Sequence, residues 1–186
     1  LATSTDDLTR GTHHLDTVDL DLPTTGLTSV GRWDPHLVRL PGEEGWLVGF
    51  VSAERWFRFH PVLAAGPDLD ALSLRAAAPD RHACEGTTVV RVDEQWWVLA
   101  SDGPDSRREV RQTYPVFDLD LRQRGVLDAE YPTNIPWPTL VPGIGAGDQA
   151  GDQAGDWWLV GFEGTPYGGP LLGYGTHGEV LVQRAR

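Results

Sequence analysis

The chain has 186 residues, enough for one domain with a sizeable core, because chains of this size bury about 70% of their unfolded surface. Its 27 acidic and 15 basic residues give a net charge of −12, which repels nucleic acid and anionic membranes. One cysteine, Cys84, excludes an internal disulfide and a multi-cysteine metal site, and no apolar run approaches the roughly 20 residues that span a bilayer.

The N-terminal region contains one strand-like run, LDTVDLDLP at 15–23, which matches YPVFDLDLR at 114–122. We therefore expect residues 1–30 to form the outer strands of a sheet whose inner strands precede the chain. His13 and His14 are a weak metal signal, because no third ligand lies near them in the sequence. The chain contains no Met, and we expect it to be the C-terminal part of a longer polypeptide.

Two repeats follow. WDPHLVRLPGEEGWLVGFVS at 33–52 aligns with CEGTTVVRVDEQWWVLASD at 84–102, which places Asp34 on Glu85. A tryptophan, Trp46 or Trp97, follows each acid after twelve residues. The sequence therefore predicts that the two carboxylates occupy equivalent positions.

A third repeat begins at WPTLV, 137–141, and reaches DWWLVGFEG at 156–164, which puts Trp137 where the acids stand. Between WPTLV and the tryptophans of DWWLVGFEG lies GAGDQAGDQAGD at 145–156, a low-complexity duplication that predicts a solvated loop. The repeat continues with two more strand-like runs, GPLLGYG and EVLVQRAR, and ends at the C-terminus.

Each repeat has the pattern of antiparallel strands: apolar, aromatic and β-branched runs of four to eight residues between Gly, Pro and Asp turns. Four short strands in about 50 residues are typical of a β-propeller blade. We expect an all-β fold with blades at 31–78, 82–128 and 134–186. Propellers close with about four to eight blades, so more chain, or self-association of two copies, would complete the ring. An irregular β-sandwich is the alternative.

The first strand of a propeller blade lines the central channel. An acid at its start points into one mouth of the channel, so Asp34 and Glu85 would share a pocket there. Trp33 and Trp137 would add aromatic surfaces for sugar rings, and His36 is a further candidate for substrate binding. Such paired carboxylates suit the cleavage of glycosidic bonds. The structural alternative is that each acid caps a turn or pairs with an arginine.

The motifs WDPHLV and CEGTTVV resemble those of five-bladed propeller glycosidases of the arabinanase and β-xylosidase family, glycoside hydrolase family 43, and of the related invertases and levansucrases. The resemblance implies an oligo- or polysaccharide substrate, no cofactor and no metal, with Glu85 as general acid and Asp34 as the acid that orients it and tunes its pKa.

Two departures from the family are visible. The general-base Asp of an early blade has no counterpart in this chain, and Glu85 is followed by Gly-Thr where the family has Gly-Pro. A non-catalytic propeller that binds carbohydrate or protein at the same mouth is therefore the alternative function. Cys84 is expected to be a small buried residue, and the tryptophans inside strands are expected to pack between blades.

Overall fold

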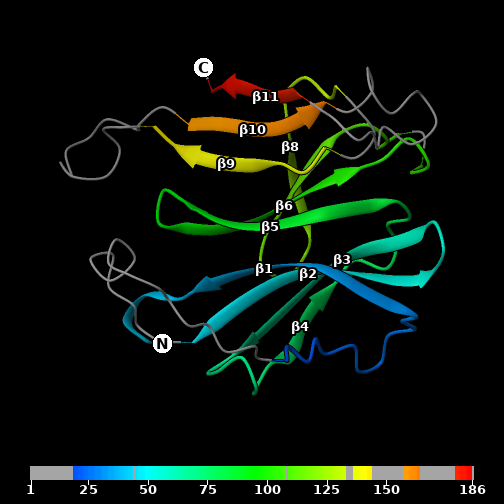
Figure 1. Ribbon diagram of the computed structural model, residues 1–186, viewed down its shortest axis with the longest axis vertical. Helices are drawn as coiled ribbons and strands as arrows, with labels where there is room; N and C mark the ends of the chain where they lie inside the picture. The colour runs from blue at the N-terminus through cyan, green and yellow to red at the C-terminus, as the bar shows by residue number, and fades with distance from the viewer. Residues whose placement is uncertain are drawn as a thin grey trace, which may run out of the picture.

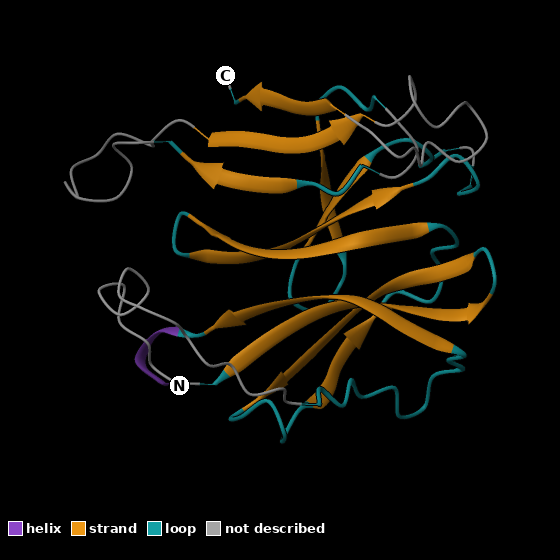
Figure 2. Cartoon of the chain, viewed as in Figure 1, coloured by secondary structure: helices purple, strands orange, loops and turns teal. Residues whose placement is uncertain are grey.

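The computed structural model describes residues 19–43, 45–107, 109–132, 136–143, 157–163 and 179–185. These residues form three antiparallel sheets and no α-helix (Figures 1 and 2). The first sheet contains β1 (Gly31–Arg39), β2 (Trp46–Arg55), β3 (Arg58–Gly66) and β4 (Ser73–Ala77) in that order. A short 3-10 turn, Pro41–Glu43, lies between β1 and β2.

The second sheet repeats this order with β5 (Cys84–Val92), β6 (Gln95–Asp102), β7 (Tyr114–Phe117) and β8 (Gln123–Leu127). The third sheet contains β9 (Thr139–Pro142), β10 (Trp157–Glu163) and β11 (Glu179–Arg184), with β10 in the centre. The all-β prediction is confirmed, and so are the four-stranded arrangements of the first two sheets.

The third sheet differs from the first two in the part that the structure describes. β11 pairs directly with β10, in the place that β3 takes beside β2, so the sheet has three strands there. The prediction of a fourth strand rested on residues 169–175, which lie outside the described residues.

The N-terminal segment covers the outer face of the first sheet. Residues 1–18 lie outside the described residues, and residues 19–30 contain no strand. Leu22 is buried in a cluster with four residues of β2 and β3, Val48, Phe50, Val62 and Ala64. This contact shields one side of the first sheet from water.

The main core lies between the first and second sheets. Leu47 and Leu63 of the first sheet meet Val89, Val98 and other residues of the second, and all four are at most 3% exposed. Each such burial stabilises the fold by about 1.5–3 kcal/mol. The buried Cys84 belongs to the same cluster, as predicted. A Cβ at Gly49 would lie 2.9 Å from the Thr87 side chain, so glycine permits the close approach of β2 to β5.

The tryptophans inside strands are half-buried rather than fully buried. Trp96 packs against the core between the first two sheets. Trp46 and Trp158 each lie under an arginine of the adjacent strand, Arg39 at 6.0 Å and Arg184 at 5.7 Å from the ring centres.

The second sheet lies between the first and the third, which occupy opposite ends of the molecule in Figure 1. The described part of the chain forms no closed ring of sheets. Among these residues, no helix is long and apolar enough to cross a bilayer.

Candidate functional site

The candidate carboxylates lie at matching irregularities of two strands. β1 has a bulge between Trp33 and His36, and β5 has one between Glu85 and Thr88. The bulge places Asp34 at φ 53° and Gly86 at φ 70°, in the left-handed region that Gly, and to a lesser extent Asp and Asn, adopt more readily than other residues. Bulges change the direction of side chains, and these two bulges lie near the starts of β1 and β5.

The strand register corrects the alignment of the repeats by one residue. Because the two bulges correspond, Trp33 is equivalent to Glu85, and Asp34 is equivalent to Gly86. The alignment was shifted because β1 and β2 are joined by the six residues 40–45, whereas β5 and β6 are joined by only two. The prediction that the two acids occupy equivalent positions was therefore wrong.

The two acids nevertheless lie near each other, since Trp33 brings the strand starts together. Its Nε1 donates a hydrogen bond to Glu85 Oε2 at 3.1 Å, and Glu85 is only 7% exposed. Burial, and then the negative charge of Glu85, raise the pKa of Asp34 to about 6. A charge effect of this kind requires the two carboxylates to be close in a partly desolvated setting.

Trp137 approaches the same segment from the third sheet. A Cβ on Gly86 would lie 2.3 Å from Cδ1 of Trp137, so the indole packs directly on this glycine. Trp137 is 40% exposed, and its ring meets Phe162 of β10 edge-on at 6.4 Å. Trp33 and Trp137 therefore both contact the Glu85–Gly86 segment.

Two hydroxyl groups of the second sheet hold the segment that carries Trp137. Thr88 Oγ1 donates to the Pro138 carbonyl at 2.6 Å, and Ser101 Oγ donates to the Pro136 carbonyl. The carbonyl groups on both sides of Trp137 are thus tied to β5 and β6, which fixes the indole beside Gly86.

His36 links the first and second sheets. Its Nδ1 accepts a hydrogen bond of 3.2 Å from the backbone N–H of Val89, on the edge of β5 that has no strand partner in the described residues. Burial lowers the pKa of His36, so the ring is neutral at pH 7 and its Nε2 carries the proton. His36 is equivalent to Thr88, so the same strand position links successive sheets.

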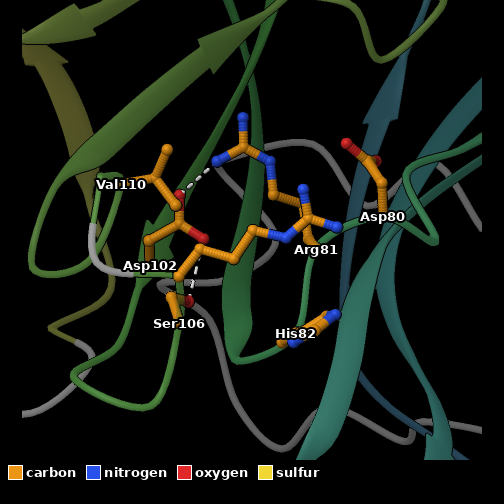
Figure 3. Close-up of a pocket in the computed structure, with 7 residues that line it drawn as sticks. Asp80, Arg81, His82, Asp102, Ser106 and Val110 are labelled. Carbon is orange, nitrogen blue, oxygen red and sulfur yellow. Dashed lines mark hydrogen bonds and ion pairs between the residues drawn. The ribbon is translucent and has the colours of Figure 1, made fainter.

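A second cluster of charged residues lies beside the start of β5, and its ion pair was missed in the sequence. Asp102, with no exposed surface, pairs with Arg81 at 2.6 Å and accepts a hydrogen bond from Ser106 at 3.2 Å (Figure 3). The equivalent positions of the first sheet hold Ser29 and Ser52, which are hydrogen-bonded to each other at 2.9 Å. Because the repeat has hydroxyl groups here, the sequence pattern gave no signal for an ion pair.

This cluster lines a cavity of about 90 Å³ whose wall also includes Asp80, His82 and Arg107. The Arg81 guanidinium lies 5.3 Å from the Phe117 ring centre and also donates to Gln123. Asp102 accepts hydrogen bonds from Arg81 and Ser106, so each oxygen of its carboxylate has a partner within the protein. The arrangement indicates a structural tie between residues 81 and 102 rather than a reactive group.

Within the described ranges, no three His, Cys, Asp or Glu side chains are grouped so that they could hold a metal ion. His13 and His14 lie outside those ranges. No protein-family model, curated protein or solved structure matches this chain at a significant level.

Proposed function

We propose that the chain is part of a carbohydrate-active β-propeller and that Asp34 and Glu85 belong to the catalytic centre of a glycosidase. The observation that carries the proposal is a contact: Trp33, the residue before Asp34, donates its indole N–H to Glu85 at 3.1 Å, and the charge of Glu85 helps to raise the pKa of Asp34 to about 6. Carboxyl groups that keep a proton near neutral pH are what the protonation of a glycosidic oxygen requires.

In this proposal the two carboxyl groups share one proton: Asp34, whose pKa is raised, retains it near neutral pH and orients Glu85, and Glu85 delivers it to the leaving oxygen. Two negative charges side by side repel each other, so the pair retains a proton to a higher pH than one isolated carboxylate would. The Trp33 N–H donates to Oε2 of Glu85 and so fixes the orientation of this carboxyl group. Trp33 and Trp137 would pack against the apolar faces of the sugar.

The propeller architecture is supported by the way the sheets repeat. The first strands of the first two sheets, β1 and β5, carry the same bulge, and β5 is linked by Thr88 to the residue that precedes β9. First strands that lie side by side are expected around the channel of a propeller.

A second candidate is a propeller that binds carbohydrate or protein without cleaving it. The observation in its favour is the depth of Glu85, which is 7% exposed and already bonded to Trp33. Under this hypothesis the exposed indole of Trp137, rather than a carboxylate, is the main contact with the ligand.

The deciding experiment separates binding from proton transfer. Titration calorimetry of the chain with arabino- and xylo-oligosaccharides measures binding, and Trp137→Ala should weaken it while the exposed control Val126→Ala should not. The chain alone should not hydrolyse aryl glycosides, because a base is also needed on the opposite face of the sugar. Turnover by the purified chain would show that the catalytic set has been assigned wrongly.

Where the same sequence is expressed within a longer polypeptide that supplies this base, hydrolysis is expected, and Glu85→Gln should remove it. The loss should be far smaller for substrates whose leaving group needs no protonation. Equal losses for good and poor leaving groups would show that Glu85 is not the general acid. Binding without any hydrolysis in such a polypeptide would favour the second candidate.

A further inference from the structure

The hairpin between β2 and β3 ends in two exposed aromatic residues. Arg55 pairs with Arg58, so Trp56 and Phe57 form a two-residue turn, with Phe57 at φ 60°. Trp56 is 86% exposed and Phe57 is 67% exposed. Isolated exposed apolar side chains are ordinary, but two adjacent aromatic rings at a strained turn are a common feature of contact sites.

The tip lies at the same end of the molecule as the carboxylates. Trp33 is opposite Val51, and β2 continues four residues further, to Arg55, which is about 13 Å at the rise of a strand. Phe59 of β3 forms a bridge with Ala83, directly before β5. Figure 1 shows this hairpin projecting beside the end of the second sheet where β5 begins.

One pair of aromatic rings lies between the hairpin that carries the tip and the carboxylates. Phe59 meets Trp33 edge-on at 5.8 Å, and Trp33 donates its hydrogen bond to Glu85. Phe57 lies two residues before Phe59 along the chain and is 67% exposed. The hairpin that carries the tip therefore contacts the candidate site through Phe59.

We propose that Trp56 and Phe57 form a distal platform on which further sugar rings of a neutral polysaccharide stack. The inference rests on the proposed function and specifies its ligand: a chain of several sugars, because a monosaccharide at Glu85 could not span about 13 Å of strand. Aromatic rings offer a broad apolar face at little entropic cost, which suits the flat face of a sugar.

Other occupants fit the tip less well. The net charge of −12 disfavours an anionic membrane surface. Two side chains also supply far less than the roughly 1,000 Å² of buried surface that a stable protein partner or second copy needs. Arg55, beside the tip, adds hydrogen-bond donors for sugar hydroxyl groups, whereas Arg58 pairs with Glu54 at 2.8 Å.

The test compares long and short ligands on the 186-residue chain. Affinity electrophoresis with linear arabinan and xylan, and calorimetry with the corresponding trisaccharides, should show that Trp56→Ala weakens polysaccharide binding about three- to tenfold and leaves trisaccharide binding unchanged. Trp56→Phe should keep most of the affinity. Val126→Ala, which shortens a 48% exposed side chain of β8, is the control.

The outcomes separate this inference from the proposed function. If Trp56→Ala changes the affinity for neither ligand while Trp137→Ala weakens the binding of both, the platform proposal is wrong and the proposed site stands. An equal loss of affinity for polysaccharide and trisaccharide in Trp56→Ala would also overturn the platform. The same holds if Trp56→Ala reduces self-association, measured by sedimentation, and leaves carbohydrate binding unchanged. If the unaltered chain binds none of these carbohydrates, both proposals fail.

Discussion

Asp34 has a carboxyl group that loses its proton with difficulty in the folded chain. Its pKa rises from 3.8 to about 6, first because of burial and then because of Glu85. A raised folded pKa means that the folded state binds more protons than the unfolded state between these two values. The contribution of Asp34 to stability is therefore lost as the pH rises from about 3.8 to about 6.

We accordingly predict that Asp34→Asn stabilises the protein at pH 7.5 and has little effect near pH 3.5. Asn tolerates the left-handed backbone at φ 53° and carries no charge to desolvate. After allowance for partial solvent screening, the gain should be on the order of 1 kcal/mol in the free energy of unfolding. Urea unfolding of both proteins at the two pH values measures it, with the exposed Asp70→Asn as control. A loss of stability at pH 7.5 would contradict the sign of the pKa shift.

In the candidate site, both backbone conformation and packing require glycine at position 86. Its φ of 70° disfavours any side chain, and a Cβ would lie 2.3 Å from Trp137. We predict that Gly86→Ala lowers the free energy of unfolding by about 2–4 kcal/mol, the sum of backbone strain and displaced packing. Gly26→Ala is the matched control, since Gly26 has φ 80° and nothing within 4 Å. Equal losses in the two variants would show that Trp137 does not pack on Gly86.

At the scale of elements, the second sheet is tied to the connection that follows β4. Asp102 at the end of β6 has no exposed surface and pairs with Arg81, which is 10% exposed. Removing one partner of a buried pair leaves the other charge uncompensated. We therefore predict that Asp102→Asn lowers the free energy of unfolding by about 3–5 kcal/mol.

The control for this prediction is the partly exposed pair of Arg124 and Asp118, whose side chains are 54% and 18% exposed. Exposed pairs contribute about 0–1 kcal/mol, so Asp118→Asn should cost little beyond its backbone contacts. Thermal unfolding of both variants gives the comparison. If Asp102→Asn costs no more than Asp118→Asn, the tie between β6 and residue 81 is not a major source of stability.

At the scale of the whole molecule, the strands could be predicted from the sequence, but their exact registers could not. Short apolar runs between Gly, Pro and Asp predicted β1, β2, β5 and β6, because strand periodicity is local. The bulges and the unequal hairpin loops are not visible as patterns, so the equivalence of Asp34 and Glu85 was misplaced by one residue. The contact of Trp33 with Glu85 depends on how two sheets stack, which no local signal reports.

The third sheet presents an apolar face that the described part of the chain leaves exposed. Val141, Val180 and Val182 share one face by their pairing with Trp158, Phe162 and Val160, and they are 41%, 73% and 51% exposed. Adjacent exposed β-branched residues on a sheet favour association. The corresponding outer face of the first sheet is covered by Leu22, so the two ends of the stack differ.

We predict that the 186-residue chain self-associates weakly through this face of the third sheet, with a weight-average mass that rises with protein concentration in sedimentation equilibrium. Val182→Glu places a charge in the middle of the face, where docking would have to desolvate it, and should return the chain to a monomer. Val126→Glu, at a 48% exposed position of β8, keeps the same charge change on another sheet and should leave association intact. If both variants reduce association equally, the cause is the added negative charge on a chain that already carries −12, and the third sheet has no special part in it.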